Sequence, residues 1–171
     1  MDRLVPRRIV VMGVSGCGKS TVAQALAQRL GLPFIEGDEL HPPDNVAAMS
    51  AGTPLTDEDR RGWLQAVAGT LAQAQTTGAV VTCSALKRSY RDLLRASAPG
   101  LRFVHLTGPQ SLLAERLQSR AGHYMPASLL QSQIDTLEPP QADEGALTQS
   151  IAQTAGQIVD ALCQQLEGPS A

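Results

Sequence analysis

The sequence predicts an α/β protein built around a parallel sheet of about five strands. Short β-branched runs alternate with longer amphipathic stretches, which is the pattern of strand–helix units wound into such a sheet. The first predicted strand, 8–12, contains an apolar run without alternation, as expected for a strand buried on both faces. A glycine-rich loop and a helix pattern follow it directly, so the chain opens with one complete strand–loop–helix unit.

The first half of the chain has clear helix and strand boundaries. A helix over 20–30 is expected to end at Gly31, because glycine readily takes the left-handed conformation that closes a helix. A second strand over 33–36 is followed by Gly37-Asp38 and then by paired prolines, which belong to a loop or to the first turn of a helix. We expect a short helix over about 45–51 and, after the N-cap residue Thr56, a longer helix to about residue 77.

The second half continues the same alternation. Residues 79–83 and 101–106 are predicted strands, and residues 86–96 form the helix between them. Pro109 opens the next helix, because a missing N–H costs nothing at the first helical position. Loop residues at 121–126 precede a helix that runs to about residue 137. A weak fifth strand is expected over 146–151, before a terminal helix over 154–166.

Composition excludes several functional classes. The 171 residues fit one domain, 1–171, and the net charge of −2 gives no basic field for a nucleic-acid backbone. No apolar run is long enough to span a membrane, and the first residues lack the pattern of a signal peptide, so a cytoplasmic protein is expected. Three cysteines at non-metal spacings predict reduced thiols rather than disulfides or a zinc site.

The loop after the first strand matches the phosphate-binding pattern G-x-x-x-x-G-K-[ST]. In such a P-loop, glycines let backbone N–H groups turn toward the phosphates, and the following helix N-terminus adds partial positive charge. Lys19 is predicted to reach the β- and γ-phosphates, and Ser20 to bind Mg²⁺. The predicted nucleotide-binding residues are Gly13, Val14, Ser15, Gly16, Cys17, Gly18, Lys19, Ser20 and Thr21.

A second group of candidates lies where other strands end. Because parallel sheets bind ligands at the carboxyl ends of their strands, Asp38, Ser84 and the loop near Gly122 should meet in one crevice. Asp38 could orient or deprotonate an acceptor hydroxyl there, or could be a turn residue. Glu36, on the same strand face, is a candidate for holding a Mg²⁺-bound water.

At this point several segments together resemble the gluconate kinases. They are 12–20, Gly37-Asp38-Glu39-Leu40-His41-Pro42, 54–60, Trp63-Leu64, Cys83-Ser84-Ala85-Leu86-Lys87, 90–95 and 122–125. The resemblance covers about residues 8–140. It implies a three-layer α/β/α P-loop kinase fold with a mobile lid over about 121–128. It also implies ATP- and Mg²⁺-dependent phosphorylation of the 6-hydroxyl of D-gluconate, and a homodimer.

A sugar acid needs cationic donors for its carboxylate and neutral hydrogen-bonding groups for its hydroxyls. The candidates for these roles are His41, Arg60, Ser84, Lys87, Arg88 and His123. Each also has an ordinary structural interpretation: Lys87 and Arg88 can be solvated helix charges, Arg60 a surface ion pair and Ser84 an N-cap. Trp63 can wall the acceptor pocket or belong to the core.

Two arginines on one helix face, Arg116 and Arg120, point toward the expected lid. We expect Arg120 to stabilise the transferred phosphoryl group and Arg116 to contact nucleotide or phosphate, although both can be ordinary helix charges. The catalytic set is therefore Lys19, Asp38 and Arg120. Two alternatives remain open: a shikimate-kinase-like enzyme acting on another small hydroxy acid, and a non-catalytic ATP-binding regulator.

Overall fold

The computed structural model describes residues 7–118 and 128–167. Its centre is a parallel sheet of five strands in the order β2–β3–β1–β4–β5. The strands are β1 (Arg8–Met12), β2 (Phe34–Ile35), β3 (Ala79–Thr82), β4 (Arg102–Thr107) and β5 (Leu147–Ser150). The predicted α/β class and strand number are confirmed.

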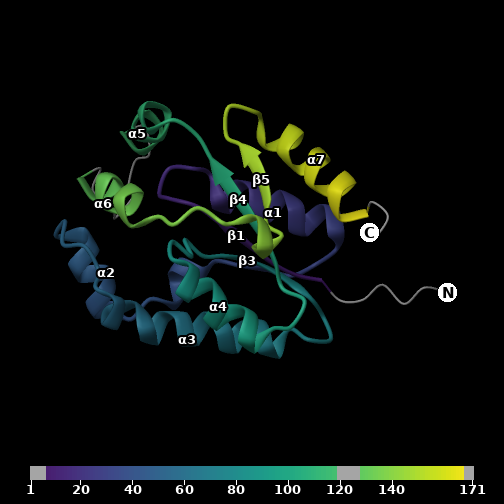
Figure 1. The fold of residues 1–171 in the computed structure, drawn as a ribbon, viewed down its shortest axis with the longest axis horizontal. Coiled ribbons are helices and arrows are strands. Elements are labelled where there is room, and N and C mark those ends of the chain that lie inside the picture. The colour runs from purple at the N-terminus through teal and green to yellow at the C-terminus, as the bar shows by residue number, and fades with distance from the viewer. Residues whose placement is uncertain (1–6, 119–127, 168–171) are drawn as a thin grey trace.

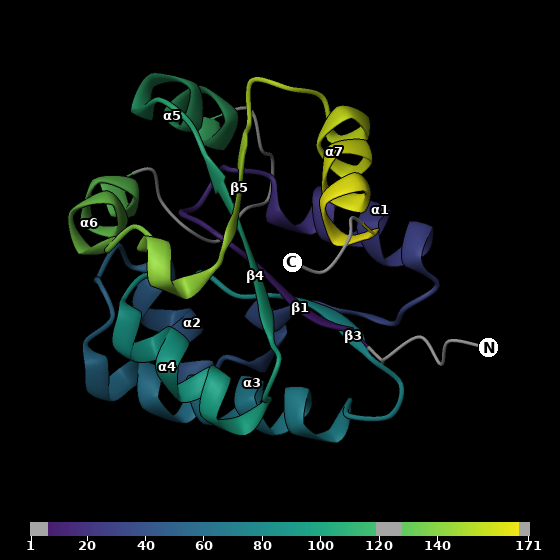
Figure 2. The same cartoon turned by 45° about the vertical axis from the view of Figure 1, so that its right-hand side comes forward.

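Helices cover both faces of the sheet. They are α1 (Lys19–Leu30), α2 (Pro43–Ser50), α3 (Asp57–Gln73), α4 (Arg88–Ser97), α5 (Gln110–Gln118), α6 (Ser128–Thr136) and α7 (Ala155–Glu167). Two short 3₁₀ helices, Gly37–Leu40 and Ala142–Glu144, complete the described elements. Figures 1 and 2 show α3 and α4 side by side on one face of the sheet and α1 and α7 on the other. The three layers are those expected of a helix–sheet–helix fold.

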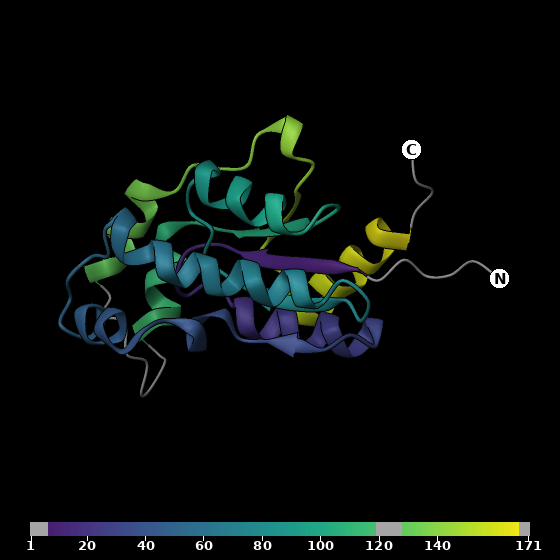
Figure 3. The same ribbon diagram turned by 90° about the horizontal axis from the view of Figure 1, so that it is seen from below.

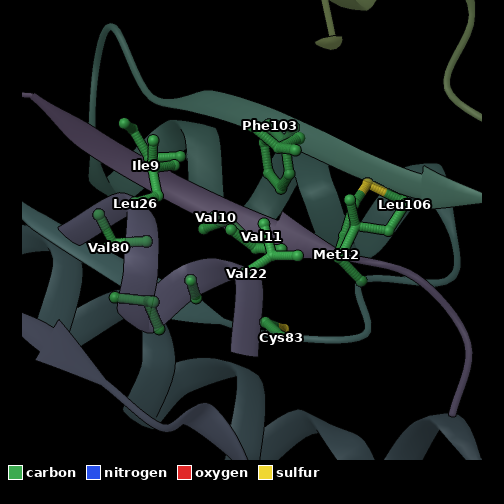
Figure 4. Packing of buried hydrophobic residues seen from close by; sticks show 14 of the residues in the cluster. Ile9, Val10, Val11, Met12, Val22, Leu26, Val80, Cys83, Phe103 and Leu106 are labelled. Atoms are coloured by element: carbon green, nitrogen blue, oxygen red, sulfur yellow. The ribbon is translucent and has the colours of Figure 1, made fainter. Parts of the chain in front are cut away.

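The core lies around β1, the central strand. Ile9, Val10, Val11 and Met12 have no exposed surface, because β1 is covered by helices on both faces. Figure 4 shows these side chains packed among Val22 and Leu26 of α1, Phe103 and Leu106 of β4, and Val80 of β3. Close packing of this kind leaves little freedom to shift a strand, so the ends of the strands are fixed in position.

Local capping explains most helix boundaries. Gly31 closes α1 in the left-handed conformation, with φ of 68°. Thr56 begins α3 with a capping box, in which its hydroxyl accepts from the Asp59 N–H and the Asp59 carboxylate accepts from the Thr56 N–H. Helix α3 ends at Gln73, earlier than predicted, and α2 begins at Pro43, where a proline fits the first helical turn.

The weak fifth strand is present, and its position accounts for its polar sequence. Within the described residues, β5 lies at the edge of the sheet and pairs with β4 alone. Along β5, only Gln149 is buried, with 8% of its surface exposed. An edge strand of this kind needs fewer apolar side chains than a central one, which is why its sequence signal was faint.

The carboxyl ends of the strands face the end of the molecule where α2, α5 and α6 lie, opposite the start of β1 (Figures 1 and 3). Parallel sheets bind their ligands at this end. None of the helices within 7–118 and 128–167 combines the length and apolar character that a membrane crossing requires.

Candidate active site

The loop Gly13–Gly18 connects β1 to α1 in a conformation that requires its glycines. Gly13, Gly16 and Gly18 have φ angles of 147°, 87° and 85°, which side chains other than glycine adopt only with strain. A Cβ atom on Gly13 would also lie 2.7 Å from the carbonyl oxygen of Leu106. The backbone therefore turns tightly into the N-terminus of α1, as a phosphate-binding loop does.

Two polar side chains follow this loop: one contacts the loop itself, and the other contacts Glu36, the residue after β2. The Lys19 ammonium donates to the carbonyl oxygens of Gly13 (3.0 Å) and Val14 (3.2 Å), so it lies curled over the loop. The Ser20 hydroxyl donates to the Glu36 carboxylate at 2.5 Å. Thr82, at the end of β3, also donates to Glu36, which places a hydroxyl–carboxylate cluster beside the loop.

Two hollows flank the phosphate loop. The first is bordered by Ser15 and Lys19 of the loop region, by Asp38 and Ser84 after other strands, and by Arg60 of α3. The second is bordered by Gly16, Cys17, Gly18 and Thr21, and by Arg116 of α5. The loop thus separates one hollow, called here the acceptor hollow, from another that we call the nucleotide hollow.

Asp38 owes its position to a glycine that no other residue can replace. The Gly37 N–H donates to the Thr82 hydroxyl (2.9 Å), and the Gly37 carbonyl accepts from the Trp63 indole N–H (2.8 Å). A Cβ on Gly37 would lie 1.7 Å from the Thr82 carbonyl oxygen, which is impossible without moving the backbone. After strand β2 the backbone therefore turns at Gly37 into the 3₁₀ helix that places Asp38 at the acceptor hollow.

Trp63 is both a core residue and a wall of the acceptor hollow. Its side chain is 1% exposed, and its ring stacks on the His41 imidazole at 4.1 Å between centroids. The Asn45 amide nitrogen lies 3.3 Å from His41 Nδ1 and also donates to the Asp59 carbonyl. An amide donor facing Nδ1 leaves the proton of neutral His41 on Nε2.

The pKa of His41 is lowered to about 4, mainly by burial; nearby Asp38 opposes this shift and nearby Arg60 adds to it. His41 should therefore stay neutral across pH 5 to 8. Because its folded pKa lies below the ordinary value of 6.5, the folded state loses stability as pH falls from about 6.5 toward 4.

An NMR titration of the histidine ring protons checks this, with His41→Gln used to assign the resonance. We expect the His41 signal to shift only below about pH 5. A midpoint near 6.5 in the folded protein would contradict the desolvated, stacked environment.

The structure brings four of the predicted acceptor residues together and leaves two aside. Asp38, His41, Arg60 and Ser84 border the acceptor hollow. Arg60 is 9% exposed and donates to the Tyr90 hydroxyl at 3.1 Å, so it is a buried cation rather than a surface ion pair. Ser84 does not cap α4, because that helix begins at Arg88 with Lys87 at the N-cap position.

Lys87 and Arg88 are engaged elsewhere in this conformation. The Lys87 ammonium lies 2.9 Å from the Asp57 carboxylate, which the Tyr90 hydroxyl also contacts. The Arg88 guanidinium pairs with Asp143 at 2.5 Å. Neither side chain borders the acceptor hollow.

Arg116 borders the nucleotide hollow, and its guanidinium donates to the Ile151 carbonyl at 2.7 Å. Arg120, His123 and nearly all of the expected lid lie outside the described residues. Gln133 of α6 is a residue of the acceptor hollow that the sequence did not single out. Nothing in its local pattern distinguishes it from Gln131 on the same helix.

The phosphate loop, a strand-end carboxylate and a buried arginine in one hollow are the parts of a small-molecule kinase. The family model for an AAA domain matches residues 9–140. The gluconokinase of Gluconobacter oxydans is 57% identical over 143 residues, which cover 82% of this chain and 80% of that protein. The chain belongs to the gluconokinase family.

Solved structures of similar proteins agree with this membership. A gluconokinase from Sinorhizobium meliloti 1021 is 51% identical, with a TM-score of 0.84 over 99% of this chain and 100% of that one. An unliganded sugar kinase from Janibacter sp. HTCC2649 is 46% identical, with a TM-score of 0.90 over 95% of each chain. The gluconokinase fold therefore extends over nearly the whole chain, including the segment after residue 140.

Proposed function

We propose that this gluconokinase-family chain transfers the γ-phosphoryl group of ATP to the 6-hydroxyl of D-gluconate, giving 6-phosphogluconate and ADP. One observation carries the proposal at the site: Lys19 of the phosphate loop and Asp38 border the same hollow, together with the buried cation Arg60. A phosphate-binding lysine, a carboxylate and a carboxylate-binding arginine are what this transfer needs in one place.

The nucleotide is assigned to the other side of the phosphate loop. Gly16, Cys17 and Gly18 border the nucleotide hollow, next to the N-terminus of α1, which favours negative charge. Arg116 and Thr154 border the same hollow, so we assign the base and ribose to this side. Lys19 would leave the Gly13 and Val14 carbonyls to meet the β- and γ-phosphates.

Mg²⁺ fits the donors beside the loop. Ser20 Oγ and the Glu36 carboxylate lie 2.5 Å apart, and Mg²⁺ sites of this kind use one or two protein oxygens, with phosphates and waters filling the rest. The ion would neutralise charge that develops on the β- and γ-phosphates. We propose that Ser20 binds the ion directly and that Glu36 holds one of its waters.

The two ends of the acceptor meet different groups: its carboxylate faces a cation, and its 6-hydroxyl faces a carboxylate. Arg60 would pair with the gluconate carboxylate, while neutral His41 and Ser84 would bind its hydroxyls. Asp38 takes the proton of the 6-hydroxyl as the O6–P bond forms, and the bond between the γ-phosphorus and the bridging oxygen breaks to release ADP.

The acceptor is tested by coupled ADP release with gluconate, shikimate, other sugar acids and nucleoside monophosphates. We expect gluconate to stimulate ATP consumption far more than the others, because the hollow offers a buried cation and neutral hydrogen-bonding groups for a sugar acid, in a chain of the gluconokinase family. Lys19→Ala removes the ammonium group proposed to face the transferred phosphoryl group, so it should abolish the stimulation. The same variant controls for contaminating kinases.

Preference for shikimate would favour the shikimate-kinase-like alternative. ATP binding without stimulation by any acceptor would favour the non-catalytic regulator. Either result would contradict the proposed function, whereas family membership supports turnover with gluconate.

A further inference from the structure

Helix α6 contacts the phosphate loop through one side chain. The Oε1 atom of Gln133 accepts a hydrogen bond from the backbone N–H of Ser15 at 2.7 Å, across 118 positions of sequence. Gln133 is half-buried and borders the acceptor hollow. The Gln133 carboxamide oxygen therefore accepts a hydrogen bond from a backbone N–H of the phosphate-binding loop.

The side of the loop on which this contact lies is informative. Ser15 borders the acceptor hollow, whereas the next three residues, Gly16 to Gly18, border the nucleotide hollow. Lys19 and Asp38 border the acceptor hollow with Ser15. The Gln133 carboxamide consequently stands where the end of the triphosphate would meet the acceptor, and not where the nucleotide itself would sit.

Helix α6 is held firmly enough to place that carboxamide. Leu129 and Leu130 at its start are buried. Just beyond its end, the Glu138 N–H donates to the Leu86 carbonyl (2.7 Å), and the Glu138 carboxylate accepts from the Arg88 N–H (2.9 Å). These contacts tie α6 to the loop after β3, which carries Ser84, so α6 connects the phosphate loop with the acceptor side.

We propose that Gln133 is a further catalytic residue, whose carboxamide contacts the transferred phosphoryl group and the acceptor hydroxyl. The proposal rests on the proposed function. An uncharged carboxamide offers an oxygen acceptor and two N–H donors. With Oε1 held by Ser15, the amide nitrogen can donate to oxygens on which charge develops, without the desolvation cost of another ion.

The rival role is purely structural: Gln133 tethers α6 to the Ser15 N–H. Gln133→Glu separates the two roles, because a carboxylate keeps the shape and accepts the Ser15 N–H at least as well but has no N–H donors. Gln133→Met keeps approximate length and removes all hydrogen bonding without adding charge. A tether predicts that Gln133→Glu keeps the wild-type kcat, and any charge repulsion then appears as a higher KM for ATP. A phosphoryl contact predicts that kcat falls in both variants.

Steady-state kinetics at saturating ATP and gluconate measure the effect. We expect kcat to fall about 10- to 100-fold in both Gln133→Glu and Gln133→Met, as for other losses of a positioned group, with a smaller change in KM for ATP. Gln131→Glu and Gln131→Met change the same chemistry on the exposed face of α6, where Gln131 contacts Gln110 and Asp135. These controls should keep wild-type kcat.

A wild-type kcat in Gln133→Glu would overturn the proposal and leave the tether. A loss confined to Gln133→Glu, with normal kcat in Gln133→Met, would also overturn it, because the added charge alone would then be responsible. Thermal midpoints of all four variants identify any that fail to fold. The other variant at the same position then decides between the two roles. Failure of the wild type with gluconate would instead refute the proposed function.

Discussion

Asp38→Asn is expected to lower kcat with gluconate by about 10²- to 10⁴-fold, the range that a positioned general base contributes. The substitution keeps the shape of the side chain and removes the charge that would take the proton of the 6-hydroxyl. A smaller drop would mean that Asp38 only orients the hydroxyl in a loose transition state. Steady-state kinetics and ATP binding by calorimetry check this, with ATP affinity expected to change little.

The neighbouring carboxylate provides the control. Glu39 follows Asp38 in the same 3₁₀ helix but is exposed, so Glu39→Gln should keep wild-type kcat. If Asp38→Asn turned over gluconate at the wild-type rate and KM, Asp38 would be a turn residue only. The acceptor base would then have to lie elsewhere along the strand ends.

Arg91→Met is expected to destabilise the fold by about 3 kcal/mol, because it removes the main partner of the buried Glu144 carboxylate, which keeps Arg95, and leaves two backbone carbonyls without their donor. Arg91 has no exposed surface, and its guanidinium donates to Glu144 (2.6 Å) and to the carbonyls of Ala85 (2.8 Å) and Glu138 (2.9 Å). It thereby supports the loop after β3, in which Ala85 takes a left-handed φ of 46°. Urea unfolding measures the loss.

The pH dependence of stability provides a second readout. Hydrogen bonding, first by Arg91 and then by Arg95 and the Gln141 N–H, lowers the pKa of Glu144 to about 2, from an ordinary value of 4.5. A depressed folded pKa stabilises the protein above about pH 4.5, and this contribution is lost as pH falls toward 2. The difference in free energy of unfolding between wild type and Arg91→Met should therefore become smaller as pH falls from about 4.5 toward 2.

An exposed pair serves as the control for Arg91. Arg29→Met breaks the ion pair with Asp160 between α1 and α7, where both side chains are more than half exposed, and should shift the urea midpoint little. An equal loss of unfolding free energy in the two variants would show that the contacts of Arg91 stabilise the fold no more than a surface ion pair does.

Local signals in the sequence were sufficient for the order of elements and for the phosphate loop. Glycine spacing, the cap at Thr56 and apolar runs depend on neighbours within a few residues, so they can be interpreted without a fold. Asp38 was also accessible, because it directly follows a predicted strand, and strand ends converge in a parallel sheet. Its 3₁₀ helix was missed, since it depends on Gly37 lying against Thr82 and Trp63.

The sequence by itself determined the α/β class, the phosphate loop and the family resemblance, because each is encoded in short runs of residues. Only the tertiary structure decided which charges face the acceptor hollow. Arg60 is turned inward by α3, while Lys87 and Arg88 pair with Asp57 and Asp143, partners at least 30 residues away. Gln133 reaches Ser15 across 118 positions, and no local pattern can encode a contact that two distant elements make when they pack.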